Sequence, residues 1–162
     1  MSTLSGEEKI LLARIITARK LTAWLLLICS LFLGGVNGAA LALGEKMPPS
    51  IYIIVVLCSA CVIWGVVLFL EQRRNTAWLR SAASLVEIVG TPKKIGRAVG
   101  IPTGSGATLY KQLKQGVIHI DGKSYGTIPG LFAEIEDGVS ATFDIAPLKF
   151  GGISGVIVHY KK

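Results

Sequence analysis

The segment Leu21–Leu43 reads LTAWLLLICSLFLGGVNGAALAL and contains no charged residue over 23 positions. A second segment, Ile51–Leu70 (IYIIVVLCSACVIWGVVLFL), is uncharged over 20 positions. Because about 20 apolar residues in a helix cross the hydrocarbon core of a bilayer, each segment is long enough to span it. The two segments dominate the mean hydropathy of the chain, which is +0.59. The sequence therefore predicts two transmembrane helices.

A short turn and a set of basic residues define the expected topology. Residues 44–50, GEKMPPS, join the two segments, and Pro48 and Pro49 cannot continue a helix interior. So short a connection predicts an antiparallel hairpin. Basic residues flank its open end, at Lys9, Arg14, Arg19, Lys20, Arg73, Arg74 and Arg80. Because positive flanks stay in the cytoplasm, we expect an integral protein of a bacterial inner membrane with both termini cytoplasmic.

A signal peptide is the alternative interpretation of the first segment. Ala40, Leu41 and Ala42 have the small-x-small form of a cleavage site that follows an apolar run. Cleavage there would leave one span and reverse the topology. Both the apolar run and the leader before it are long for a signal peptide, and this length favours the hairpin.

Small residues mark one face of each span. In the first span they recur at every fourth position, at Ser30, Gly34, Gly38 and Ala42, and in the second they are Cys58, Cys61 and Gly65. Small residues let helix backbones approach closely in lipid. We expect these faces to pack against each other within one chain, and the alternative is a homo-oligomer through the first face. The C-x-x-C spacing of Cys58 and Cys61 lies mid-span without a histidine, so we interpret both as small apolar residues.

The segments that flank the hairpin are predicted to be helical. Ser5 and Glu8 have capping-box spacing, and a helix within residues 1–20 would follow them. Its apolar face consists of Ile10, Leu11, Ile15 and Ala18. This helix either lies on the cytoplasmic leaflet or extends the first span. Residues 71–84 are expected to form a basic helical linker. The side chains expected at the membrane surface are Arg14, Arg19, Lys20, Arg73, Arg74, Trp78 and Arg80.

In residues 85–162 apolar residues alternate over short runs, and glycine and proline are frequent, as in a small all-β domain. Strands are expected at 85–89, 94–101, 107–113, 115–120, 123–128, 139–146 and 155–160, and 107–120 is interpreted as one long strand or two. Asp121 and Gly122 predict a type I′ hairpin turn. One helical turn is expected within 129–138. Five to six strands in this arrangement favour a small cytoplasmic barrel, SH3-like or OB-like.

The layout of two spans followed by a small β domain is similar to that of NfeD-like membrane proteins. The two uncharged segments and the short strands after them carry this similarity, which is one of layout. It implies an OB-type barrel in the cytoplasm.

No catalytic set, metal site or cofactor is predicted. His119 and His159 are the only histidines, and each stands among apolar neighbours without cysteine or clustered carboxylates nearby. Glu134, Glu136 and Asp137 fit a solvated turn. We therefore expect a protein that is not an enzyme.

The stretch Gly100–Lys111, GIPTGSGATLYK, has the composition of a phosphate-binding loop but not its pattern. A P-loop needs a lysine and a hydroxyl residue directly after its last glycine, at the start of a helix. No lysine directly follows Gly106, so we interpret the stretch as a connection between two strands that offers no helix start to an anion. The residues expected to contact a partner are Lys93, Lys94, Arg97, Gly104, Gly106 and Lys111.

The β domain is basic. From Leu79 onward the chain holds ten basic and six acidic residues, a net charge of +4. Its aromatic side chains, Tyr110, Tyr125, Phe143 and Tyr160, could stack on the bases of a nucleic acid. Attraction to an anionic leaflet explains the same charge without a further partner, so nucleic acid is not the expected ligand.

These observations favour a non-enzymatic membrane protein. The hairpin would anchor a small cytoplasmic domain that docks onto a membrane complex or a partner protein. One alternative is a regulatory module whose basic barrel binds nucleic acid or a nucleotide. A second is an oligomeric transport or pore component, because two uncharged spans cannot line a polar path as a monomer.

Overall fold

The computed structural model describes residues 3–44, 48–81, 84–96 and 105–162. The chain divides into two compact units. One is Arg19–Arg73, and the other combines Met1–Ala18 with Arg74–Lys162. The boundaries fall inside the two long helices, so each helix contributes residues to both units.

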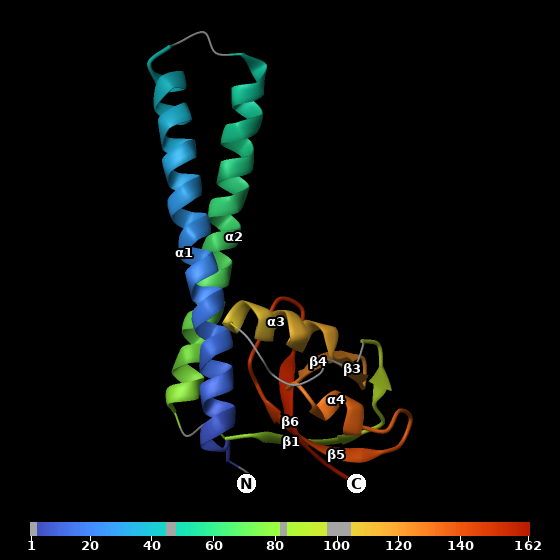
Figure 1. Cartoon of the computed structure of the whole chain (residues 1–162). Coiled ribbons are helices and arrows are strands. Elements are labelled where there is room, and N and C mark those ends of the chain that lie inside the picture. Colours follow the sequence, from blue (N-terminus) through green and yellow to red (C-terminus); the bar gives the residue numbers. More distant parts are fainter. Residues whose placement is uncertain (1–2, 45–47, 82–83, 97–104) are drawn as a thin grey trace. The chain divides into compact units, whose positions relative to one another are not determined.

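The first unit is a hairpin of two helices (Figure 1). They belong to α1 (Gly6–Ala42) and α2 (Pro49–Arg80). Both are long and apolar enough to cross a membrane, with mean hydropathies of 2.0 and 3.0 in their apolar windows. Only 6% and 11% of those windows are buried, whereas the core helix of a soluble protein would be mostly covered. Trp24 and Phe69 pack edge to face at 5.5 Å, one from each helix.

The second unit is built on one mixed sheet of six strands in the order β1-β5-β6-β4-β3-β2. The strands are β1 (Val86–Gly90), β2 (Lys93–Lys94), β3 (Val117–Ile120), β4 (Lys123–Thr127), β5 (Ala141–Ala146) and β6 (Gly155–Lys161). The β4–β6 pair is parallel and the other pairs are antiparallel. The helices α3 (Gly106–Gln115) and α4 (Leu131–Glu134) contact the sheet at β4 and β6 respectively (Figure 1).

The predicted closed barrel is wrong, and so is the OB-type barrel implied by the similarity to NfeD-like proteins. The sheet is open, with β1 and β2 at its two edges. Only Thr91 and Pro92 separate these strands in the chain, and they do not pair with each other in the described part of the structure. The sheet buries apolar side chains on both faces: one face packs in a cluster with α1 and α3, and the other packs in a cluster with Phe132 of α4.

The prediction of a strand at 107–113 is also wrong, because this segment lies in α3. Ser105 is its N-cap residue and accepts a hydrogen bond from the Thr108 amide. Leu109 and Leu113, four residues apart, form the buried face of the helix. The all-β description of the domain fails for this reason.

Several local predictions are confirmed. Asp121 and Gly122 form the turn between β3 and β4, with φ of 49° and 74°, as a type I′ hairpin requires. The helical turn in 129–138 is α4. Strands occur where they were expected near 85, 117, 123, 141 and 155. The strand expected at 94–101 is present only as β2, and residues 97–101 lie outside the described residues.

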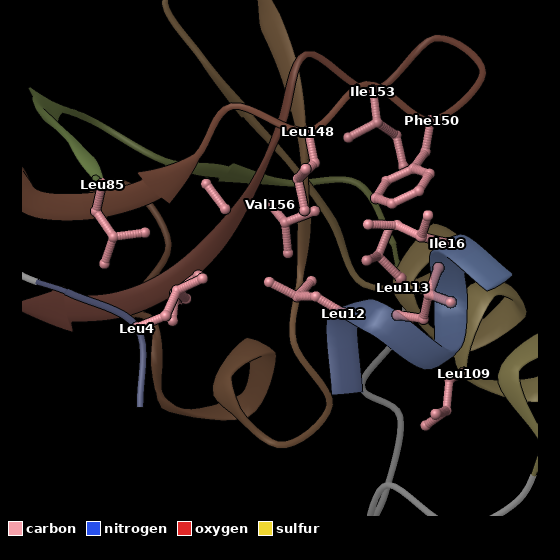
Figure 2. Close-up of a cluster of buried hydrophobic side chains, with 13 residues drawn as sticks. Leu4, Leu12, Ile16, Leu85, Leu109, Leu113, Leu148, Phe150, Ile153 and Val156 are labelled. Carbon is pink, nitrogen blue, oxygen red and sulfur yellow. The ribbon is translucent and has the colours of Figure 1, made fainter. Parts of the chain in front are cut away.

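The start of α1 is part of the core of the second unit. Figure 2 shows Leu12 and Ile16 of α1 with Leu113 of α3 and Phe150 from the chain before β6. Leu12 and Ile16 are 0% and 4% exposed. A helix lying on a leaflet would turn its apolar face to lipid, but most of this face is inside the core. Ile10, assigned to that face from the sequence, is instead 57% exposed.

The contact between α1 and α3 is close enough to require glycine. A Cβ at Gly106 would lie 2.2 Å from the carbonyl oxygen of Arg14 and 2.9 Å from the Cβ of Ala18. Backbone cannot move aside cheaply, so any side chain at this position would separate the two helices. The glycine expected to contact a partner therefore has a packing role within the unit.

Substituting Leu12 tests the contribution of α1 to this core. Leu12→Ala should destabilise the second unit by about 2–5 kcal/mol, because it removes a fully buried side chain and leaves a cavity. Ile10→Ala is the matched control on the same helix and should change stability by no more than about 0.5 kcal/mol. Thermal unfolding of the purified full chain, followed by near-ultraviolet circular dichroism, measures both. Equal effects of the two substitutions would contradict the packing described here.

Candidate functional site

A groove of about 460 Å³ runs between the ends of α1 and α2 that belong to the second unit. Its lining residues are Lys9, Ile10, Ala13, Ile16, Thr17, Thr76, Leu79 and Arg80. Ile10, Ala13 and Thr17 follow the i, i+3, i+7 spacing of one helix face. The walls are therefore largely apolar, and Lys9 and Arg80 are their only charged residues.

The α2 side of the groove is fixed by one asparagine. The amide nitrogen of Asn75 donates to the carbonyl oxygen of Lys149 at 2.8 Å, and the Lys149 amide donates to Asn75 Oδ1 at 3.2 Å. Asn75 is 2% exposed, so both bonds are shielded from water. Trp78 and Leu79 pack against the same core cluster as Leu12. This pairing holds the last turns of α2 against the chain that precedes β6.

The α1 side begins with the predicted capping box, which is confirmed. The Ser5 amide donates to Glu8 Oε2 at 2.7 Å, and the Glu8 amide donates to Ser5 Oγ at 3.3 Å. The other carboxylate oxygen of Glu8, Oε1, lies 3.0 Å from Nε2 of His159 on β6. Glu8 therefore caps α1 and attaches it to the sheet.

His159 lies between two carboxylates. Its Nδ1 is 3.4 Å from Oδ2 of Asp144, which is 1% exposed and also lies 3.2 Å from Nζ of Lys161. Glu87 of β1 is the register partner of Asp144. The hydrogen bond of the His159 ring goes to Glu8, and Asp144 stands beside the other ring nitrogen. We name the group of Glu8, Asp144, His159 and Lys161 the latch.

His119 makes a separate contact with a hydroxyl group. Its Nε2 lies 2.8 Å from Oγ of Ser124, its register partner across the β3–β4 hairpin. A Ser–His pair needs an orienting third group for nucleophilic catalysis, and the described residues place no carboxylate in an ion pair with His119. They also contain no group of three His, Cys, Asp or Glu side chains arranged to hold a metal ion.

In the hairpin unit, small residues of the two helices meet at specific points. A Cβ at Gly34 would lie 3.1 Å from the Cβ of Cys58, and one at Gly65 would lie 2.9 Å from Cγ of Leu27. Ser30 is buried, and Cys61 is half-buried. Gly38 has no atom within 4 Å of its would-be Cβ, and Ala42 is exposed. Ser30, Gly34 and Cys58 also line a hollow of about 420 Å³.

The residues expected at a membrane surface are divided between the two units. Arg19, Lys20 and Arg73 belong to the hairpin unit, whereas Arg14, Arg74, Trp78 and Arg80 belong to the second unit. Arg80 lines the groove. Arg14 lines a neighbouring hollow together with Glu7. Trp78 is half-buried against the core. These side chains therefore occupy several environments.

The residues expected to contact a partner lie on separate elements. Lys93 and Lys94 form the edge strand β2, and Nζ of Lys94 lies 4.9 Å from the centre of the Phe132 ring. Lys111 is exposed on α3. Arg97 and Gly104 lie outside the described residues. Because lysines on an edge strand discourage further strand pairing, β2 has a reason for its composition that involves no ligand.

Among the described residues of this unit, the pKa values of Tyr125 and Lys162 are shifted, and neither residue lines the groove. Burial raises the pKa of Tyr125, and the nearby carboxylate of Asp121 raises it further. The hydrogen bond that Lys162 donates to Glu136 raises the pKa of its ammonium group. Both effects follow from local contacts.

Sequence reasoning missed both the groove and the latch. Ile10 was assigned from the sequence to the apolar face of a helix that would lie on the leaflet or extend the first span, so no groove was expected there. The latch joins Glu8 to His159, which are 151 residues apart in the chain, and no local pattern predicts such a pair.

Comparison of the chain with protein-family models, with curated proteins and with solved structures finds no match. The NfeD-like layout therefore gains no support from a shared family. The groove and the fold are the basis for assigning a function.

A double-mutant cycle tests the latch. Glu8→Gln retains the capping box, because glutamine can make the same bond to the Ser5 amide, but it removes the charge that faces His159. Combined with His159→Gln, it should show a coupling of about 0.5–1 kcal/mol, because either substitution alone already changes the contact between the two side chains. Unfolding of the full chain by urea measures it. Strictly additive effects of the two substitutions would show that the contact contributes nothing to stability.

Proposed function

We propose that this protein is a non-enzymatic integral membrane adaptor. In this proposal the hairpin anchors the chain, and the second unit docks onto a partner protein or a membrane complex. The observation that carries the proposal is the groove between Lys9–Thr17 and Thr76–Arg80, which is apolar, has a basic edge and is filled by no segment of the described chain. Apolar concave surfaces with a few charged groups are typical binding sites.

Membrane anchoring is supported by the exposure of the two apolar helices. Side chains such as Phe32, Val56 and Ile63 are 70%, 67% and 67% exposed. Water would make this exposure costly, by roughly 25 cal/mol for each Å² of apolar surface, whereas lipid removes the cost. The basic flanks of the spans favour a cytoplasmic location for both termini, in a bacterial inner membrane.

The absence of catalysis is part of the proposal. Its support is that the polar side chains near one another are engaged in structural contacts. His159 and Glu8 attach α1 to the sheet, and His119 pairs with Ser124 across a hairpin. Neither pair lines the groove.

The topology has a direct test. In a background where Cys29, Cys58 and Cys61 are replaced by alanine, Ser50→Cys should react with a membrane-impermeant maleimide in intact cells. Lys123→Cys should react only after the cells are permeabilised, because the second unit is expected in the cytoplasm. Both positions are exposed in the structure. Labelling of Lys123→Cys in intact cells would contradict the proposed orientation.

Photo-crosslinking in intact cells tests the adaptor function. A benzophenone amino acid at Ile10, which lines the groove, should give an adduct with one other protein at native expression. The same amino acid at Glu134, an exposed position on α4, is the matched control and should give little adduct. Mass spectrometry of the adduct identifies the partner. If exposed positions across the whole second unit give no adduct, or adducts only of this chain with itself, the adaptor function is wrong.

A further inference from the structure

We infer that the groove between α1 and α2 binds an acidic amphipathic helix of a partner protein. The inference rests on the proposed adaptor function and names the structure and charge of the partner segment. The shape of the groove, the backbone of its walls and the charges at its edge each support one part of it.

The shape of the groove fits a helix. Ile10, Ala13 and Thr17 are spaced as one stripe of α1, and Thr76 and Arg80 are spaced four apart on α2. Two helices with such stripes leave a longitudinal groove, and the side chains of a third helix can pack into it. Ile10 is 57% exposed, so its apolar side chain is available to contact the third helix.

The backbone of the walls favours a helix over an extended peptide. Both walls are α-helices, which pair their own amides and carbonyls internally. An extended segment in the groove would find no backbone partner there, and an unpaired buried amide costs free energy. A helix pairs its own backbone groups, so it can present an apolar face to Ile10, Ala13 and Leu79 without this cost.

The edge charges select an acidic partner. Lys9 and Arg80 are both exposed, and no acidic residue lines the groove. Glu7 lines the neighbouring hollow together with Arg14. Carboxylates on the flanks of the incoming helix would therefore meet two cations, and lysines there would be repelled.

A lipid chain is a poorer occupant of the groove. Arg19 and Lys20 stand between the groove residues and the first apolar span in the sequence, and Arg73 and Arg74 stand between them and the second. An acyl chain that reached Ile10 would have to leave hydrocarbon and pass these charges, which is unfavourable. A protein segment on the aqueous side meets no such barrier.

Two synthetic helices of 18 residues test the inference against the full chain in nanodiscs of neutral lipid. They share a leucine stripe at i, i+3, i+4 and i+7, and they carry either glutamate or lysine beside the stripe. Fluorescence anisotropy should show about tenfold tighter binding of the glutamate peptide, and the difference should shrink in high salt. Equal affinities, or no binding of the glutamate peptide, would overturn the inference.

Reversing the charges at the edge of the groove tests whether the peptide binds there. Lys9→Glu with Arg80→Glu should invert the preference, so that the lysine peptide binds more tightly. Lys111→Glu with Lys123→Glu changes the net charge by the same amount at exposed positions outside the groove and should leave the preference unchanged. If both double variants act alike, bulk charge explains the binding and the inference is wrong.

A large side chain in the groove distinguishes a partner helix from a second copy of this chain. Ala13→Trp should abolish binding of the glutamate peptide while circular dichroism of the chain stays unchanged. Native mass measurement should show a monomer in both forms. A dimer of the parent chain that Ala13→Trp dissociates would instead assign the groove to a second copy. If Ala13→Trp leaves peptide binding intact while photo-crosslinking still finds a partner, the adaptor function stands and the location of the site is wrong.

Discussion

The burial of α1 against the sheet and α3 is the contact on which the second unit depends. Leu12, Ile15 and Ile16 are 0%, 0% and 4% exposed. Full burial of such a side chain contributes roughly 1.5–3 kcal/mol, so these three together are comparable with the net stability of a whole domain. The sheet buries apolar side chains on both faces, and α1 and α3 cover the face that carries Val156 and Val158. Without these helices that face would be exposed to water.

The polar contacts at the two helix ends complement this apolar contact. Burial of one apolar stripe sets the rotation of each helix coarsely, because the hydrophobic effect itself has no direction. The hydrogen bonds of Asn75 to Lys149, and the contacts of Glu8 to Ser5 and His159, do have direction. They add fixed points of attachment at the two helix ends. Ile10 and Ala13 line the groove beside Leu79, which also contacts the core.

The sequence predicted those features whose cause is local. The Asp121–Gly122 turn depends on two residues that tolerate positive φ, and the two apolar helices depend on composition alone. The α3 segment was misassigned because apolar residues at Leu109, Tyr110 and Leu113 satisfy both a strand and a helix over so short a run. The barrel was predicted because residues 85–162 were treated as self-sufficient, whereas the core takes side chains from residues before the first span. The groove could not be predicted, because it requires that α1 and α2 be brought together outside their apolar segments.

The division of the second unit into Met1–Ala18 and Arg74–Lys162 has a consequence for biosynthesis. Val156, which packs in the same cluster as Leu12, follows it by 144 residues (156 − 12) in the chain, so the ribosome makes it long after the helix that it covers. Until then the apolar face of α1 has no intramolecular cover, and contacts of such long sequence separation form slowly. The nascent chain is therefore most in need of a chaperone during that interval, when Leu12 and Ile16 are exposed and β6 does not yet exist.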